Sequence, residues 1–530
     1  MYNCKIIWYN LCSVESVPCC TFKGELLELD KIALVKLSGS DLSVKFIEMT
    51  KNKSFVVYNE ISMPVELTKD FYEDYFIKPA VVKEVVSILG VYKQLMDREG
   101  VLDAICYASS VLNEAKNNNG FLNEIAGITG LKFRVLTPEE ELNYVYTSVI
   151  NTFNKPKGLI VHLSDYSTSF MLYNRRNILN TLVVNYGYIN AYNDAEEHDE
   201  KYAVDKLNKR LASELKANDW ITNLQEEFEV VCTGDMFRGF GAISRKASKY
   251  PVDMEHNFEF SKENFEKVYS AIKAQDIGKT TKVKGVRLEL CKYLPFAFAT
   301  MNAVLPNINK DVFAVSKTDE AEGLLFNYVL PLTIEKPISD ALGYSLQVIN
   351  EYYDRKPNNA LHVYELSMIL FKQLKVLHKL GRSYIKVLRI ASYLYASGLR
   401  VNNSTKEKAA FDIILNSEIY GVSHKEVVLA AFVVFVRNAD NFSLSDWVKY
   451  KELVTEEDLA AVKKLAVILK IAESLDVTGF GSVTDINCDI LGDSVIMKTI
   501  VTLDSSLEIK NAMLNANEFR KAFKKNLEIL

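Results

Sequence analysis

The sequence predicts a multidomain α/β protein in which two similar α/β lobes precede an all-α region and a small α+β segment. Its 530 residues are too many for a single hydrophobic core. A pattern of strand, polar turn and strand occurs at 31–50 and again at 158–174, and each is followed by further strands and amphipathic helices. Residues 356–480 instead read as helices only, and strand patterns return near the C-terminus.

The composition excludes several classes of protein. With a net charge of −5 and an isoelectric point near 5.9, the chain lacks the positive charge of a general nucleic-acid binder, so we expect no nucleic-acid polymer as partner. No run of about 18 apolar residues is present, which predicts no membrane span. The eight cysteines form no C-x-x-C pair, and this favours reduced thiols and a cytoplasmic location over a disulfide framework or zinc site.

Changes in pattern along the chain predict its division into domains. The first residues, MYNCKIIWYNLCSVESVPCC, are mildly apolar but lack the basic start and long apolar run of a signal peptide. The pattern turns from α/β to helical after Pro337. We expect an extension outside the fold at 1–30, lobes at 31–150 and 151–335, a helical domain at 336–480 and a small C-terminal α+β domain at 481–530.

Both hairpins have the form of a turn that wraps a phosphate with backbone N–H groups. Such a turn normally carries glycines, which let the backbone approach the anion, and its first strand normally ends in a carboxylate that holds a metal. In GLIVHLSDYSTSFMLYN (158–174) the first strand instead contains His162, and the turn holds Ser164, Asp165 and Tyr166. The hairpin is therefore either a phosphate site that has lost its chemistry or no such site at all.

Two related lobes that each open with such a hairpin resemble the architecture of the actin, hexokinase and acetate kinase superfamily. Two unrelated βββαβ lobes are the alternative on the repeat alone. The second lobe continues with FEVVCTGDMFRGFGAISRKASKYP (228–251), a strand, a turn at Gly234 and a helix. KDVFAVSKTDEAEGLLFNYVL (310–330) repeats the order of strand, polar turn and helix.

A series of segments in fixed order resembles one known family. The stretch YASSVLNEAKNNNGFLNEIAGITGLKFRVLTPEEELNYVY (107–146) follows the family segments A-T-S-A-x-R-E-A-x-N and S-G-x-E-E-A at the correct separation. YGYIN, TGDMFR and DEAEG fit later segments, and ASYLYASGL, LNSEIYGVSHKE and IAESLD fall at the expected places in the helical region. From residue 31 to about 500 the chain is similar to the Ppx/GppA family of exopolyphosphatases and guanosine pentaphosphate phosphohydrolases.

The resemblance implies a fold, a ligand and a set of site residues. It implies two actin-like (ribonuclease H-like) lobes, an all-α HD-related domain, a small C-terminal domain, Mg²⁺ as cofactor, polyphosphate or a guanosine polyphosphate as ligand, and a homodimer through the helical domain. Glu141 aligns with the general base, with Glu140 as the alternative, although acids at the start of any helix also favour its macrodipole. The phosphate-binding positions that it implies are Ser38, Gly39, Ser40, Ser109, Ser110, Ser167, Thr168, Gly234 and Arg238.

Many residues that the family chemistry needs are replaced. Lys36 and His162 stand where the family has metal-binding aspartates, and because a lysine repels a cation, we assign no metal ligand. Lys36 either bridges the lobes, faces solvent, or neutralises phosphate directly. Asp165 would place a negative charge against a phosphate, a repulsion on the order of 4 kcal/mol at ~4 Å and an effective dielectric constant of about 20. Further replacements are Asn113, Tyr166, Ser169, Asp235, Met236 and Ala321.

The helical region has lost the residues of an HD metal site in the same way. Tyr395 and Ala396 stand in place of the His–Asp pair, and Val436 stands in place of a later histidine. His362 and His424 remain, but two isolated histidines do not form a metal site, and we expect them to have surface or capping roles.

Two main hypotheses follow. The first is a Ppx/GppA-type pseudoenzyme, catalytically impaired, that binds or regulates. The second is an active exopolyphosphatase or pppGpp phosphohydrolase that uses Glu141 with a rearranged cation site. An actin-like sugar or acetate kinase is disfavoured, because such kinases need the missing carboxylates and lack the helical C-terminal domain.

Overall fold

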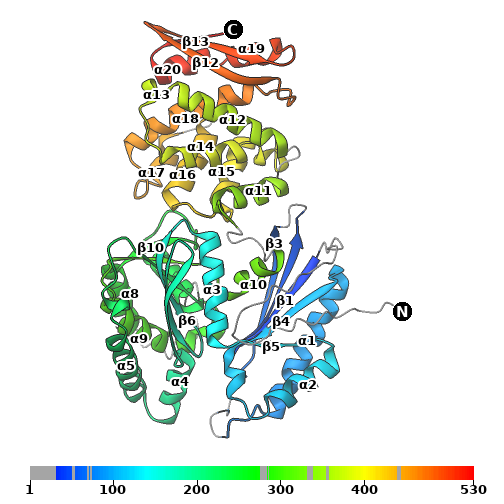
Figure 1. The fold of residues 1–530 in the computed structure, drawn as a ribbon, viewed down its shortest axis with the longest axis vertical. Coiled ribbons are helices and arrows are strands. Elements are labelled where there is room, and N and C mark those ends of the chain that lie inside the picture. Colours follow the sequence, from blue (N-terminus) through cyan, green and yellow to red (C-terminus); the bar gives the residue numbers. More distant parts are fainter. Residues whose placement is uncertain are drawn as a thin grey trace. The chain divides into compact units, whose positions relative to one another are not determined.

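The computed structural model describes residues 31–50, 54–67, 71, 74–274, 283, 286–330, 338–353, 357–437 and 443–530. The extension expected at 1–30 lies outside the described residues. The chain forms two compact units (Figure 1). The first ends at Ser248 and resumes over Glu255–Ser339, and the second comprises Lys249–Met254 and Asp340–Leu530.

The first sheet of unit 1 grows from the hairpin at 31–50. β1 and β2 pair in antiparallel register, β3 extends the meander, and β4 lies parallel to β1 on its other side, giving the order β3-β2-β1-β4-β5. β1 is largely a continuous run of apolar residues, and nearly all of its side chains are buried. The elements are β1 (Lys31–Leu37), β2 (Asp41–Met49), β3 (Phe55–Pro64), α1 (Pro79–Glu99), β4 (Asp103–Ala108), α2 (Asn118–Thr129) and β5 (Arg134–Val135).

The second sheet repeats this topology. Its order, β10-β11-β9-β6-β7-β8, again contains an antiparallel meander of three strands and parallel neighbours on the other side of the first strand. The hairpin pattern that repeats in the sequence therefore belongs to two whole sheets of similar topology. The elements are β6 (Lys157–Leu163), β7 (Thr168–Asn174), β8 (Asn177–Val184), α4 (Tyr188–Glu197), α5 (Glu200–Ala217), α6 (Asp219–Thr222), β9 (Glu229–Thr233), α7 (Asp235–Ala247), β10 (Phe258–Ser261), α8 (Lys262–Ala274), α9 (Leu294–Val304) and β11 (Val312–Val315).

Two helices are exchanged between the sheets. α3 (Pro138–Thr152) precedes the second sheet in sequence and buries Leu142 and Val145 against it, whereas α10 (Glu320–Val329) follows that sheet but packs Leu325 into the core of the first. We call the first sheet with α1, α2 and α10 the first half of unit 1, and the second sheet with α3 to α9 the second half.

The exchanged helices cross in close contact. A Cβ atom added at Gly323 of α10 would lie 1.8 Å from the carbonyl oxygen of Tyr144 in α3, far inside van der Waals contact. Only glycine allows the two backbones to approach this closely. The crossing therefore fixes where the N-terminal ends of α3 and α10 lie relative to one another.

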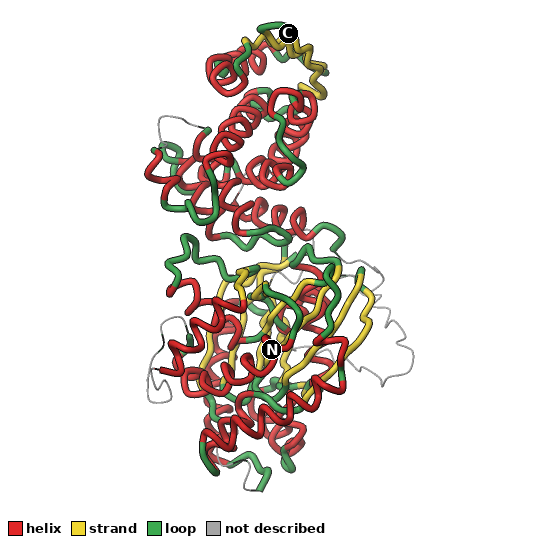
Figure 2. Tube along the Cα trace, turned by 90° about the vertical axis from the view of Figure 1, so that its left-hand side faces the viewer, coloured by secondary structure: helices red, strands yellow, loops and turns green. Residues whose placement is uncertain are grey.

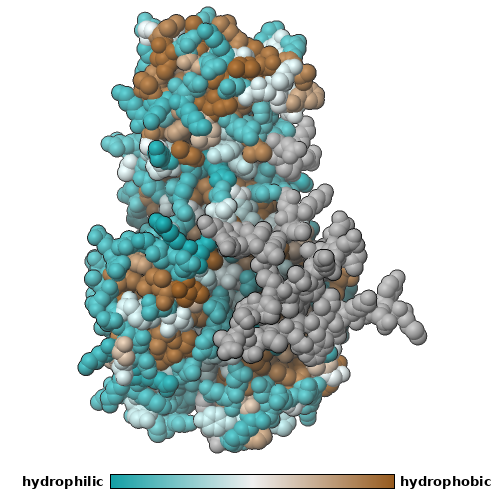
Figure 3. All heavy atoms as spheres, in the orientation of Figure 1, coloured by the Kyte–Doolittle hydropathy of each residue, from teal (hydrophilic) through white to brown (hydrophobic). Residues whose placement is uncertain are grey.

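Unit 2 is helical and ends in a small three-stranded sheet (Figure 2). Helices and sheet share one hydrophobic core, in which α16 is buried on nearly every side. The exposed side chains of Leu491, Ile500 and Val501 lie on β12 and β13, and Figure 3 shows apolar surface in this part of the chain. The elements are α11 (Ala341–Tyr353), α12 (Pro357–Gln373), α13 (Lys375–His378), α14 (Tyr384–Leu394), α15 (Lys406–Asn416), α16 (His424–Val436), α17 (Leu444–Val448), α18 (Glu456–Ser474), β12 (Val483–Leu491), β13 (Ser494–Val501), α19 (Ser506–Met513), α20 (Ala516–Phe523) and β14 (Asn526–Ile529).

The predicted α/β class is confirmed for the N-terminal region, and the helical pattern after it agrees with unit 2. The structure differs in detail. Within the region expected to be helical, α12 and α13 are separated at Leu374, which leaves helical geometry at ψ 12°. Lys524 ends the last helix in the left-handed region at φ 59°. The chain then returns to the sheet as β14, whose four residues are too few to give a periodic signal. Across the described residues, none of the helices has the length and apolarity that a membrane span needs. The domain boundaries that the sequence suggested stay predictions.

We predict that Gly323→Ala destabilises the protein, because the new methyl group collides with the α3 backbone. The expected loss is about 1–3 kcal/mol or more in the free energy of unfolding, measured by chemical denaturation. Gly90→Ala is the matched control, since no atom lies within 4 Å of a Cβ at this position of α1. There the same substitution should stabilise by about 0.5–1 kcal/mol through helix propensity. Equal effects at the two positions would contradict the close crossing.

Candidate functional site

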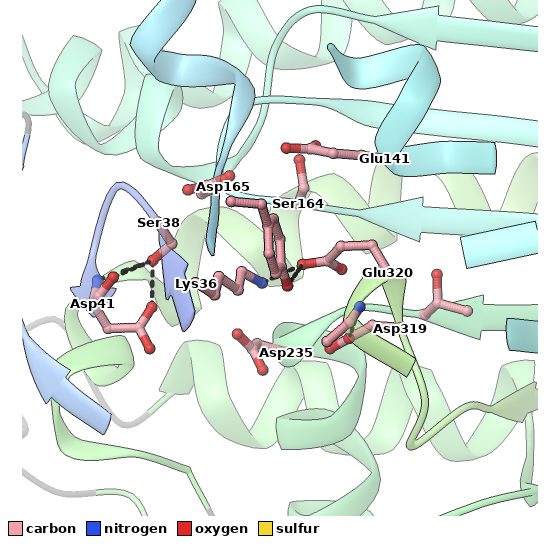
Figure 4. Close-up of polar contacts among 12 residues, drawn as sticks. Lys36, Ser38, Asp41, Glu141, Ser164, Asp165, Asp235, Asp319 and Glu320 are labelled. Carbon is pink, nitrogen blue, oxygen red and sulfur yellow. Dashed lines mark hydrogen bonds and ion pairs between the residues drawn. The ribbon is translucent and has the colours of Figure 1, made fainter. Parts of the chain in front are cut away.

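The N-terminal ends of α3, α7 and α10 converge beside the two hairpin turns. This is a suitable place for an anion, because helix N-termini present unpaired N–H groups and positive potential. Each end, however, already carries a carboxylate: Glu141 in α3, Asp235 in α7 and Glu320 in α10. In Figure 4 the Lys36 side chain lies between Glu141 and Asp165 on one side and Asp235 and Asp319 on the other.

Lys36 is the central cation of this cleft. It stands near the end of β1, and its ammonium forms an ion pair with the carboxylate of Glu320, which also accepts a hydrogen bond from the Tyr107 hydroxyl at 3.4 Å. Burial alone would lower the pKa of Lys36, but Glu320 and the other nearby acids outweigh it and raise the pKa well above its usual value. Lys36 therefore stays protonated, and its positive charge is already neutralised by Glu320. Glu320 belongs to the stretch 151–335 predicted as the second lobe, so the pair joins the two predicted lobes, although β1 and α10 share the core of the first half.

The two candidate bases have different roles. Glu141 is buried, and its Oε1 accepts a hydrogen bond from the Ser110 backbone N–H at 3.0 Å. Burial, followed by the charges of Asp165 and Glu320, raises the pKa of Glu141 well above its usual range. Glu140 instead completes the capping box of α3, accepting from the Thr137 N–H at 3.0 Å. Glu141 is thus the acid that lies in the cleft.

The turn of the first hairpin is engaged by the second. The Gly39 N–H donates to Oδ2 of Asp165 at 2.9 Å, and Ser38 turns its hydroxyl to the Asp41 carboxylate. Ser40 donates its N–H to Ser38 Oγ at 3.3 Å. The expected phosphate-binding groups of this turn therefore bond within the protein.

The second hairpin turn and the end of β4 show a similar arrangement. Ser167 shares its hydroxyl with Ser164 at 3.0 Å, and Thr168 donates to the Tyr186 carbonyl at 3.0 Å. The Ser110 N–H is taken by Glu141. The Ser109 hydroxyl is buried, and among the described residues it has no hydrogen-bond partner. Ser109 is thus the one predicted phosphate-binding side chain in this part of the site that is both buried and unsatisfied.

Gly234 and Arg238 lie where α7 begins. Gly234 has φ +108°, and a Cβ there would come 2.2 Å from the Leu163 carbonyl oxygen, so only glycine fits this turn. Arg238 forms ion pairs with Asp235 and, at 3.0 Å, with Asp319. Although burial raises the pKa of Asp235, Arg238 and then Arg287 overcome this and hold it well below its usual range.

Arg287 is a member of the site that no sequence pattern indicated. Its guanidinium reaches Asp41 at 2.8 Å and Ser62 at 3.0 Å in the first half, and Asp235 at 3.0 Å in the second. It lies in a stretch without motif or periodicity, and only the fold brings it to the cleft. A pocket bordered by these charges remains, lined by Leu34, Lys36, Asp41, Ser43, Lys45, Glu60, Tyr107, Asp235, Arg238, Arg287, Asp319 and Ala321.

This pocket is small. The centre of a water molecule has about 30 Å³ in which to lie, room for about two waters. The cations on its wall are all paired: Lys45 meets Glu322 at 2.5 Å, and the other three bind the acids described above. An entering anion would have to displace these carboxylates.

Comparison with known proteins shows which family has this architecture. The family model described as the Ppx/GppA phosphatase family matches residues 47–331, more than half of the chain. The chain belongs to the Ppx/GppA phosphatase family. No curated protein sequence matches it.

One solved structure agrees with this fold. An exopolyphosphatase from Cytophaga hutchinsonii superposes with a TM-score of 0.52 at 13% identity, covering 56% of this chain and 97% of its own. A Ppx/GppA family member from Aquifex aeolicus gives a TM-score of 0.47 at 19% identity, with coverage of 56% and 97%. At such identities the likeness of the Cytophaga structure speaks for the fold alone.

The residues at the two positions where Ppx/GppA proteins were expected to hold a metal do not fit a divalent cation. Lys36 is an ammonium group already paired with Glu320. His162 is buried, and its Nδ1 lies 2.8 Å from the Thr233 hydroxyl. Burial lowers the pKa of His162, so the ring is neutral at pH 7, a weak substitute for a carboxylate toward Mg²⁺, which prefers oxygen ligands. Nowhere in the described part of the chain do three or more His, Cys, Asp or Glu side chains gather as a metal site would need.

Unit 2 places an arginine network near the segment compared with an HD site. Arg437 is buried, bonds Glu473 at 2.7 Å and Glu407 at 3.5 Å, and lies over the Tyr395 ring at 5.2 Å. The surface or capping role expected for His424 is wrong: its side chain is buried with Nδ1 3.1 Å from the Tyr250 hydroxyl, and Ser423 caps the helix instead.

Breaking the Lys36–Glu320 pair from one side should destabilise the protein. In Lys36→Met the Glu320 carboxylate keeps its burial but loses its cation, and we expect a loss on the order of 3 kcal/mol in the free energy of unfolding. The double variant Lys36→Met/Glu320→Gln should recover most of it, because no charge is left unpaired. Denaturant titration of both variants measures this, and a double variant no more stable than the single one would speak against the pair.

Asp165 should make stability depend on pH. Burial raises its pKa from 3.8 to about 6, so the folded state holds this proton more tightly than the unfolded state. As the pH rises from 4 to 7, ionisation of Asp165 therefore lowers the free energy of unfolding by up to about 3 kcal/mol. Asp165→Asn should be more stable than the wild type at pH 7.5, with a smaller difference at pH 4.5, in thermal denaturation scans. A difference independent of pH would show that this carboxyl does not titrate as described.

Proposed function

We propose that this chain is a Ppx/GppA-type protein of polyphosphate or guanosine-pentaphosphate metabolism that is catalytically impaired and acts by binding or regulation. The observation that carries the proposal is Lys36, paired with Glu320 in the cleft where the family comparison expects a metal-binding carboxylate. Hydrolysis of a terminal phosphoanhydride needs the charge on the phosphoryl oxygens neutralised as the attacking water is deprotonated. A lysine in place of that carboxylate would repel the divalent cation that supplies this neutralisation.

The occupied donors support the same proposal. The Gly39 N–H bonds Asp165, the Ser110 N–H bonds Glu141, and Arg238 is held by Asp235 and Asp319. In a phosphate-transferring site such groups would face the substrate. Loss of one oxyanion donor typically lowers a rate by about 10²–10³, and here several are committed elsewhere.

A second function, an active exopolyphosphatase or pppGpp phosphohydrolase, is favoured by one observation. Glu141 lies buried in the cleft with a raised pKa, as a general base requires. The expectations of a homodimer, an HD-related helical domain and a separate C-terminal domain rest on the family resemblance, and that of a cytoplasmic location rests on the cysteines. All of them accompany either proposal.

Phosphate release distinguishes the two functions. We expect the wild type to release no more phosphate from long-chain polyphosphate or pppGpp with Mg²⁺ than Glu141→Gln does, because the metal has no carboxylate at Lys36. Glu140→Gln, which alters the cap of α3 and leaves Glu141 in place, serves as the control for damage to the helix. Release by the wild type and by Glu140→Gln that disappears in Glu141→Gln would overturn the proposal and establish the second function.

A further inference from the structure

We propose that the turn between β1 and β2 is an anion site whose resident anion is the Asp165 carboxylate, and that an external oxyanion binds there by displacing it. The inference deepens the proposed function and rests on it in one respect, that the cleft is a binding site. It gives that site a specific form of regulation, because the protein supplies its own competitor.

The contact between the two turns carries the inference. The Gly39 N–H donates to Asp165 Oδ2 at 2.9 Å, the bond that a phosphate oxygen would accept in such a turn. The fit is close, since a Cβ at Gly39 would lie 2.7 Å from Cε2 of Tyr166 and 3.1 Å from Asp165 Oδ2. Asp165 and Tyr166 are both buried, so the donor is covered as well as bonded.

The backbone of Asp165 is fixed independently of its side chain. Its carbonyl accepts the Ile189 N–H at 3.1 Å, and a Cβ at Gly187 would lie 2.3 Å from the same carbonyl oxygen. Among the described residues, the carboxylate itself bonds the Gly39 N–H and, at 3.1 Å, the N–H of Tyr166 next to it, and no other group. A rotation of this side chain therefore releases Gly39 without unfolding the turn.

An unsatisfied group adjoins the same turn. Ser109 donates its N–H to the Leu37 carbonyl at 2.9 Å, immediately before the turn begins. Its hydroxyl is buried and has no partner in the described structure. A buried hydroxyl without a hydrogen bond costs free energy, which an oxyanion at this place would recover.

The charges around Asp165 do little to hold it at the turn. The groups that act on it are Lys36 from β1, Asp41 from β2, Glu141 from α3, Tyr188 from α4, Tyr293 before α9, and Glu320 from α10. Lys36 is the one cation among these and is already bound to Glu320. Asp165 thus faces mainly acids, and the turn holds it by one N–H rather than by an opposite charge.

Binding of tripolyphosphate, without Mg²⁺, tests the inference in the full-length protein. Three forms are compared with the wild type: Asp165→Ala, which removes both the charge and the acceptor; Asp165→Asn, which removes the charge only; and Asp97→Asn, an exposed aspartate of α1 as control. Affinity is measured by calorimetry. The Gly39 amide resonance is followed in protein labelled with ¹⁵N-glycine and assigned through Gly39→Ser.

We expect Asp165→Ala to bind tripolyphosphate at least about tenfold more tightly than the wild type, with Asp165→Asn between them and Asp97→Asn unchanged. The Gly39 resonance should shift on binding in the Asp165 variants. Equal affinity in all four forms, or a Gly39 resonance that tripolyphosphate leaves unmoved in Asp165→Ala, would overturn the inference. If Asp165→Ala fails to fold, Asp165→Asn gives the same comparison. Because the readout is binding at Gly39 and not phosphate release, a hydrolytically active wild type would contradict the proposed function alone.

Discussion

The close crossing of α3 and α10 is the constraint on which the site depends. Tyr144 and Gly323 meet backbone to backbone, and this contact holds the first turns of the two helices at the cleft. Glu141 and Glu320, which belong to those turns, consequently lie near one another and near Lys36. Burial raises the pKa of Glu141, and the charges of Asp165 and Glu320 raise it further, more than Lys36 lowers it. The geometry that brings the helices together thus contributes to the raised pKa of Glu141.

The charged side chains of the cleft form ion pairs with one another. Arg238 and Arg287 share Asp235, and Lys36 and Lys45 each hold a glutamate of α10. Ion pairs of this kind contribute little net stability once desolvation is counted, yet removing one partner is costly. A ligand that competes for these cations must therefore supply at least as much negative charge in equally good geometry. This suits a polyanion better than a single monovalent anion.

Local signals in the sequence were sufficient for much of the fold. Thr137, Pro138 and Glu140 specify the start of α3, and both hairpins appear as apolar runs around polar turns. Gly234 is needed where the sequence suggested a turn, because its positive φ excludes other residues.

Other features depend on contacts between distant segments and could not be predicted. Arg287 bonds Asp41, which lies 246 positions away in the sequence, and no local pattern around Arg287 indicates this partner. The pairing of Lys36 with Glu320 follows from the exchange of α10 into the first half, which no periodicity reveals. The burial of His424 likewise comes from Tyr250, a residue of a short segment far earlier in the chain.

The exchange of the two helices also ties the charges of the site to both sheets. α3 packs on the second sheet and α10 on the first, so Glu141 is anchored by one sheet and Glu320 by the other. The Lys36–Glu320 pair, by contrast, joins two elements that share one core, so the ammonium group is neutralised without a contribution from the second sheet.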